Sequence, residues 1–412
     1  MLRLTSLLGL VVLIGLAWGL SRHRRLFPWQ TVLWGLGLQF VFAVLILKTE
    51  AGRVVFGAAR LVVAKIAEFA GEGAKMVFGP LADGEALGAA FGPNAYVFAV
   101  TVTAVIVVVS SISAALYHYG ILQRVVHAMA WVMRRLLRTS GSETLAATSN
   151  IFVGQTEAPL LIRPYLKGMT ESELMALMTC GFATVASSVF AIYAQLGVDA
   201  GHLLTASVLS APAGLIIAKI MLPETEESET TADASAEVER TTTNGLDALC
   251  RGAGDGMMLA INVIAMLIAF VALVALVNAV ITAPQAALGV AEPVTFQQFL
   301  GWLNWPFAWV IGIRPEDCAA VGQVMGERIV LNEFVGYLTL SQMQETLDPR
   351  SFTLAAYALC GFANLSSIAI QIGGIGSLVP ERRGDLARLG LRAMVGGVLA
   401  CYLSATIVGV LL

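Results

Sequence analysis

The stretch NIFVGQTEAP, residues 150–159, lies between apolar runs and is too polar to cross a bilayer as an ordinary helix. A second stretch, NEFVGY at residues 332–337, has the same character in the other half of the chain. Both contain an asparagine and a glutamate. An ionisable side chain inside the hydrocarbon layer is costly and normally faces a cavity or a partner, so Glu157 and Glu333 are expected to be functional.

An internal repeat surrounds these stretches. The letters CGFA occur at residues 180–183 and again at 360–363, and each copy is followed by small polar residues inside an apolar run. In the topology given below, the first copy's span starts on the inner side of the membrane and the second copy's starts on the outer side. Inverted repeats with interrupted segments are typical of secondary transporters whose site lies near the midplane.

Composition places most of the chain in lipid. Of 412 residues, 57% are hydrophobic and 13% are charged, against about 25% charged in an ordinary soluble domain. A net charge of -3 gives nothing to attract nucleic acid, and the five cysteines lack the spacing of metal ligands or of a disulfide framework. The fold class expected is an all-α integral membrane protein.

Apolar runs predict about eight transmembrane helices, each near the length of about 20 residues that a bilayer requires. Arginines follow the first run at positions 22, 24 and 25, so this run is expected to be a retained span with its N-terminus outside. An even number of crossings returns the C-terminus to the outside, in a cell (inner) membrane. The runs are 4–20, 29–47, 94–117, 173–196, 203–222, 257–281, 353–378 and 391–411.

Between the spans, the charged residues Arg53, Arg60, Lys65, Glu68, Glu72 and Lys75 share one helical face, which predicts an interfacial amphipathic helix at about 53–77. Residues 119–138 predict a similar connector on the inner side. The domains expected are scaffold helices (1–118), a first repeat with a hairpin at about 140–166 and two spans (119–222), a flexible cytoplasmic linker (223–245), and a second repeat (246–412). The second repeat should contain the span 257–281, an interfacial segment, a hairpin at about 315–341 and two spans.

The polar residues of the interrupted segments suit a neutral ligand. Gln155, Thr156, Asn364 and Ser367 carry amides or hydroxyls that donate and accept hydrogen bonds. An anionic substrate would need a basic partner, and only Arg328 is near. The alternative is that one or both glutamates are protonated and only hydrogen-bonded, or lie in water at a hairpin mouth.

Oxygen ligands for a small cation are also present. Asn150, Thr184 and the backbone carbonyls freed where Val153 and Val185 interrupt helices suit an alkali ion. Helix capping by Asn150 and Thr184 is an equally good interpretation of the same residues.

Three motifs together resemble the concentrative nucleoside transporter family over nearly the whole chain: GQTEAPL at 154–160, GER at 326–328 with NEFV at 332–335, and CGFAN at 360–364. The family often has Lys where Arg328 stands. The resemblance implies a homotrimer in which a scaffold holds a moving transport domain with two re-entrant hairpins, which travels like an elevator. It implies a bacterial symporter that imports nucleosides such as uridine with sodium, and no organic cofactor.

The resemblance also implies roles for particular residues. Gln155, Thr156 and Glu157 would bind the nucleobase, and Glu333, Asn364 and Ser367 the ribose. Val189 and Phe362 match apolar positions of the pocket, although simple packing explains them equally well. Asn150, Thr184 and the carbonyls of Val153 and Val185 match the sodium site.

Three alternatives stay open from the residues. Bacterial members of the family use either sodium or protons, and the retained Asn150 and Thr184 favour sodium. The same architecture could carry another neutral solute. A membrane-embedded hydrolase using the two glutamates as acid and base is the least favoured, because the four histidines lie at predicted span ends or in connectors and no nucleophile accompanies the pair.

Overall fold

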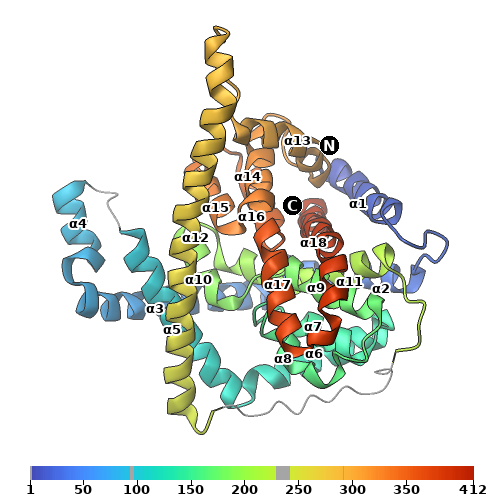
Figure 1. The fold of residues 1–412 in the computed structure, drawn as a ribbon. Helices are drawn as coiled ribbons and strands as arrows, with labels where there is room; N and C mark the ends of the chain where they lie inside the picture. Colours follow the sequence, from blue (N-terminus) through green and yellow to red (C-terminus); the bar gives the residue numbers. More distant parts are fainter. Residues whose placement is uncertain (1, 93–96, 229–241, 291) are drawn as a thin grey trace.

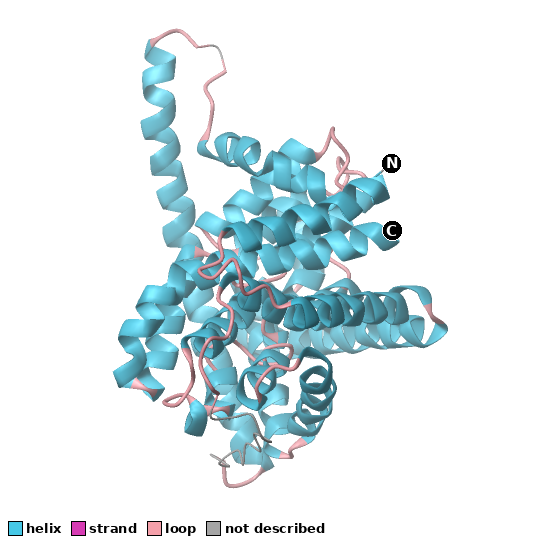
Figure 2. Ribbon diagram, turned by 90° about the vertical axis from the view of Figure 1, so that its right-hand side faces the viewer, coloured by secondary structure: helices cyan, strands magenta, loops and turns pink. Residues whose placement is uncertain are grey.

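The computed structural model describes residues 2–92, 97–228, 242–290 and 292–412, and these are helical or loop with no strand (Figures 1 and 2). The all-α class is confirmed. Helices that begin and end the chain lie together, and Arg3 donates a hydrogen bond to the carbonyl of Leu412 at 2.7 Å. The long helix α12 (Gly245–Ala287) extends past the rest of the chain at one end in both views.

Six helices of the described chain are long and apolar enough to cross a membrane. Five correspond to expected spans, although α18 begins eight residues before its predicted run, and the sixth, within α12, begins twelve residues before its predicted run, where the Asn244 side chain caps the helix. The five are α1 (Leu2–Gly19), α2 (Trp29–Lys48), α5 (Phe98–His118), α11 (Ala200–Met221) and α18 (Arg383–Leu411).

The other two expected spans, 173–196 and 353–378, are not continuous helices. The first is α9 (Glu171–Ala183) followed by α10 (Ser187–Gln195), and the second is α16 (Pro349–Leu359) followed by α17 (Leu365–Leu378). In the second break the Asn364 side chain accepts a hydrogen bond from the Ser367 N–H at 2.9 Å and so starts a new helix. The first break directly follows the CGFA at 180–183, and the second break contains the CGFA at 360–363.

Two helix pairs occupy the ranges where hairpins were expected. The first is α7 (Gly141–Ser149) and the short α8 (Ala158–Leu161), and α7 begins with a capping box formed by Ser140 and Glu143. The second is α14 (Cys318–Val330) and α15 (Glu333–Gln342), where the Asn332 side chain caps α15 by accepting from the Val335 N–H at 2.9 Å. We call these hairpin 1 and hairpin 2.

The connecting helices are amphipathic. The expected interfacial helix is α3 (Glu50–Phe78), and it is followed by α4 (Gly84–Phe91), which projects with it from one side of the molecule (Figure 1). The N–H groups of Ala86 and Glu85 donate to the Asp83 side chain at the start of α4, which lowers the pKa of that carboxyl. The other two amphipathic connecting helices are α6 (Ile121–Leu137) and α13 (Phe296–Ile311).

The expected linker 223–245 is described only in part, because residues 229–241 lie outside the described residues. Its first residues are held rather than free: Glu224 accepts from the Thr170 hydroxyl at 2.9 Å, and Ser228 donates to Glu173. The short 3-10 helices are η1 (Gly79–Ala82), η2 (Arg163–Tyr165) and η3 (Pro380–Arg382).

The centre of the fold is built from α9, α11 and α18, which pack closely because small residues face their neighbours. A Cβ placed on Gly397 of α18 would lie 2.4 Å from the Cβ of Phe182 in α9. A Cβ on Gly214 of α11 would lie 2.7 Å from the Cys180 sulfur. Close approach at small residues is how helices associate within membranes, and here it fixes the break after α9 in the centre of the molecule.

Candidate functional site

The predicted site residues lie at four interruptions of helical structure. Hairpin 1 contributes its connecting loop, the break between α9 and α10 contributes a second segment, the start of α15 a third, and the break between α16 and α17 a fourth. At such interruptions, backbone N–H and C=O groups make no hydrogen bonds within a helix and can bind a ligand instead. Interrupted helices in membrane proteins therefore often line binding sites. The members are Asn150, Val153, Gln155, Thr156 and Glu157 (hairpin 1); Thr184, Val185 and Val189 (α9 to α10); Glu333; and Phe362, Asn364 and Ser367 (α16 to α17).

Glu333 lies at the first residue of α15 and is only 6% exposed. One carboxylate oxygen accepts from the Tyr193 hydroxyl at 3.0 Å, and the other accepts from the Asn364 amide at 3.2 Å. The Asn364 carbonyl oxygen accepts from the Ser367 N–H and, at 2.7 Å, from the Ser366 hydroxyl. Glu333, the Asn364 side chain and the Ser367 backbone N–H are therefore linked in one buried hydrogen-bond network.

The tip of hairpin 1 reaches the same helix, α17, farther along its length. The Gln155 carbonyl oxygen accepts from the Gln371 amide at 2.9 Å. One turn on, a Cβ on Gly374 would lie 2.9 Å from the Thr156 methyl group, so glycine is what lets the tip pack there. Asn364 and Gln371 are seven residues apart, which at about 1.5 Å per residue is about 10 Å along the helix. Hairpin 1 and hairpin 2 thus contact α17 at two points about two turns apart.

Glu157 is placed differently from Glu333. Its side chain is exposed, and its carboxylate accepts from the Gly154 N–H of its own turn at 3.3 Å. No contact joins it to Glu333 among the described residues, so the two glutamates do not form a pair.

The two apolar candidates differ in burial. Val189 is buried at the start of α10, whereas Phe362 in the second break is only half-buried. One turn after Val189 in α10, Tyr193 stacks on Tyr337 of hairpin 2 with ring centroids 4.2 Å apart. The Glu333 carboxyl group is therefore hydrogen-bonded to one ring of a stacked tyrosine pair.

The proposed cation ligands contain one oxygen without a hydrogen-bond partner. Asn150 is fully buried; its amide nitrogen donates to the Ala146 carbonyl at 3.0 Å, while its carbonyl oxygen accepts nothing from the described residues. An unsatisfied buried acceptor costs about 1–3 kcal/mol unless something fills it. Thr184 instead donates its hydroxyl back to the Cys180 carbonyl at 2.9 Å, and its oxygen still has lone pairs to offer. The unpartnered Asn150 oxygen is a hard donor of the kind that an alkali cation prefers.

The two repeats touch directly at their breaks. The Phe362 N–H donates to the Thr184 carbonyl at 3.2 Å, and a Cβ on Gly361 would lie 2.8 Å from the Phe182 carbonyl oxygen. The proposed cation segment and the proposed substrate segment are therefore joined by a hydrogen bond. Arg328 lies behind them, fully buried, donating to the Gly361 carbonyl at 3.3 Å and to the Cys401 sulfur at 3.0 Å. Its guanidinium supports the break, while its Nη1 atom has no hydrogen-bond partner among the described residues.

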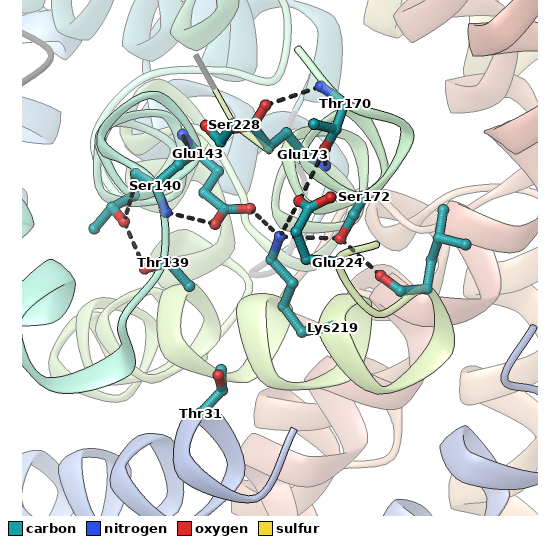
Figure 3. Close-up of polar contacts among 12 residues, drawn as sticks. Thr31, Thr139, Ser140, Glu143, Thr170, Ser172, Glu173, Lys219, Glu224 and Ser228 are labelled. Atoms are coloured by element: carbon teal, nitrogen blue, oxygen red, sulfur yellow. Dashed lines mark hydrogen bonds and ion pairs between the residues drawn. The ribbon is translucent and has the colours of Figure 1, made fainter. Parts of the chain in front are cut away.

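A buried ionic cluster anchors the base of hairpin 1 (Figure 3). Lys219 of α11 forms ion pairs with Glu143 of α7 at 2.7 Å and with Glu224 at 3.3 Å, and it donates to the Ser172 hydroxyl at 3.0 Å. Burial of these charges is tolerated because each has a partner. The cluster ties α7 to the start of α9 and the end of α11.

Sequence reasoning missed Gln371, Tyr193 and the Lys219–Glu143 pair. Gln371 and Tyr193 are single polar residues inside apolar runs, and Lys219 was counted only among the positive charges of the inner side. A polar group in a lipid-embedded run is the signal that could have found them.

An all-helical membrane protein with two hairpins, two broken helices and a buried site between them defines a secondary transporter. Comparison with known proteins gives the family. Sequence models described as Na+ dependent nucleoside transporter N-terminus and C-terminus match residues 8–81 and 202–409, and one described as nucleoside recognition matches residues 99–199. The chain belongs to the concentrative nucleoside transporter family; it is a nucleoside transporter and not an enzyme.

Relatives and solved structures agree with this assignment. An uncharacterised transporter of Haemophilus influenzae is 42% identical, with 98% of this chain and 97% of that protein covered. Sodium/nucleoside cotransporter 1 of Rattus norvegicus is 37% identical over 99% of this chain, which spans 64% of that protein. Structures of CNTnw in an inward-facing substrate-bound state and of a variant in an outward-facing state are each 40% identical, with TM-scores of 0.93 and 0.94, covering all of this chain and 98% and 97% of those chains. The elevator-type fold expected from the sequence is confirmed.

Proposed function

We propose that this protein imports nucleosides such as uridine by coupling their movement to a sodium gradient, with the ribose held at Glu333, Asn364 and Ser367 and the base at Gln155, Thr156 and Glu157. The observation that carries the proposal is the pair of contacts that hairpin 2 and hairpin 1 make with α17, at Asn364 and at Gln371. A nucleoside has a sugar with several hydroxyls at one end and a ring with hydrogen-bonding edges at the other. These groups match the donors and acceptors of the residues proposed for the ribose and for the base. Val189 and Phe362 supply apolar contact.

The sodium part of the proposal rests on Asn150. Its free carbonyl oxygen, together with Thr184 and the carbonyls of Val153 and Val185, would hold the ion. Since Thr184 is hydrogen-bonded to Phe362 beside the ribose residues, ordering of the cation segment also orders the substrate segment, which is the linkage that cotransport requires. Residues 119–222 and 246–412 would form the inverted repeats, 1–118 the scaffold, and three chains the working assembly.

Competition of labelled uridine uptake in proteoliposomes tests the substrate class. Unlabelled nucleosides should compete, while sugars and amino acids at the same concentration should not. Full competition by a free sugar, with none by nucleosides, would replace nucleosides by another neutral solute. Proton coupling is the second candidate for the driving ion, and uptake driven by a pH gradient in the absence of sodium would favour it.

A further inference from the structure

Gln371 is a buried amide that the proposed binding residues do not include. It lies two turns from Asn364 on the face of α17 that meets hairpin 1, and it is fully buried. Its nitrogen makes two hydrogen bonds, at 2.9 Å to the Gln155 carbonyl oxygen and at 3.1 Å to the backbone carbonyl of Met178 in α9.

The Met178 carbonyl determines which way the Gln371 amide points. A backbone carbonyl can only accept, so the Gln371 atom facing it must be the nitrogen. The same nitrogen faces Gln155, and the atom that Gln155 offers must therefore be its oxygen. Rotating the Gln371 amide by half a turn would set its oxygen against two acceptors, which is unfavourable in a buried place.

Gly181 provides the room for this contact. A Cβ on Gly181 would lie 2.8 Å from the Gln371 nitrogen and 3.1 Å from the Gln155 Cβ. Any larger residue at 181 would push the two amides from their positions. Gly181 is the glycine of the first CGFA copy, so the first repeat makes space for an amide of the second repeat.

Because the Gln155 carbonyl oxygen accepts a hydrogen bond from Gln371, the Gln155 amide nitrogen is the atom available to a ligand. Gln155 is 7% exposed, and its nitrogen donates to no other described residue. This nitrogen still has two N–H groups that can donate to a ligand. We infer that Gln371 is a positioning residue that fixes the Gln155 amide with its nitrogen toward the pocket, so that the protein selects ligands whose ring presents a carbonyl oxygen or unprotonated ring nitrogen there.

This inference rests on the proposed function, and binding measurements on the purified full chain test it. Uridine is compared with 2-thiouridine and 4-thiouridine, in which one carbonyl oxygen becomes a weaker acceptor while the ribose and the N3–H remain. The wild type should bind one of the two thio analogues more weakly than uridine, by roughly three- to tenfold, which is the effect of one hydrogen bond. The quantity compared is the Kd of the thio analogue divided by the Kd of uridine. In Gln371→Leu this ratio should fall to the value measured in Gln155→Ala. Because Gln155→Ala lacks the amide, any ratio that remains in it reports the size of sulfur alone.

Two further variants separate positioning from packing. Gln155→Ala/Gln371→Leu should show the same ratio as Gln155→Ala alone, because Gln371 acts through Gln155. Gly181→Ala should lower the ratio without removing a polar group. Gln39→Leu is the matched control: Gln39 is another buried amide that donates to a backbone carbonyl, that of Leu209 at 2.9 Å, and its loss should leave the ratio unchanged.

A folded Gln371→Leu or Gly181→Ala protein that keeps the wild-type ratio overturns the inference. Equal binding of uridine and both thio analogues by the wild type also overturns it, because Gln155 then donates to neither oxygen. Failure of the wild type to bind uridine at all contradicts the proposed function instead, so the two failures are distinguishable.

Discussion

Glu333 shows most directly how a single residue serves the site. It is buried, and its two carboxyl oxygens accept hydrogen bonds from Tyr193 and Asn364. The nearest basic group, Arg328, donates instead to Gly361 and Cys401. The carboxylate is therefore free to strengthen hydrogen bonds to ligand hydroxyls.

Glu333→Gln should reduce uridine uptake strongly. Hydrogen bonds to a charged acceptor are worth about 1.5–3 kcal/mol each, so the loss of one corresponds to roughly a tenfold or larger fall in binding. Initial rates in proteoliposomes measure the effect, with Tyr193→Phe as the control that removes one protein donor but keeps the charge. Near-normal uptake by Glu333→Gln would remove the residue from the substrate site.

Asn150→Ala should weaken uridine binding mainly at low sodium. The variant deletes the buried carbonyl oxygen that accepts no hydrogen bond from the described residues, so the cation would lose a ligand while the substrate residues remain. Binding titrations at several sodium concentrations check this. Ser149→Ala is the neighbouring control, since that hydroxyl donates to the Leu145 carbonyl within α7 at 2.6 Å. An unaltered sodium dependence in Asn150→Ala would exclude Asn150 from the cation site.

At the scale of helices, the sequence predicted which runs enter the membrane better than where they break. The repeated CGFA and the polar residues after it indicated interruptions, yet 173–196 and 353–378 read as continuous because three to five non-helical residues barely change the hydropathy of a long run. The Asn364 cap could be recognised from the sequence as a capping residue. The contact between Gln155 and Gln371 could not, because it joins residues 216 positions apart.

The buried ion pair between Lys219 and Glu143 is expected to stabilise the folded protein. Lys219→Met leaves Glu143 buried beside no cation, and breaking a buried pair in this way costs about 3–5 kcal/mol. The purified variant should lose its folded state at a clearly lower temperature than the wild type. Lys219→Met/Glu143→Met should recover part of the loss, because both members of the pair are then apolar. Equal thermal stability of Lys219→Met and the wild type would show that the cluster in Figure 3 does not anchor hairpin 1.

On the scale of the whole molecule, large apolar side chains remain exposed on α3 and α12. Exposed large side chains include Leu61, Val62 and Phe69 on α3, and Leu273, Leu276 and Val280 on α12. Lipid or other copies of the chain must cover them. We expect a homotrimer, with a protein mass of three times the 43.5 kDa of one chain by light scattering corrected for detergent. A monomer mass at all protein concentrations would contradict the expectation.

The central claim is that sodium drives nucleoside import, and uptake of labelled uridine into proteoliposomes under defined ion gradients tests it most directly. Uridine should accumulate inside when sodium is higher outside, and accumulation should vanish when a sodium ionophore removes the gradient or when potassium replaces sodium. A pH gradient alone should drive none. Accumulation that follows the pH gradient and ignores sodium, or the absence of accumulation under any sodium gradient, would contradict the account.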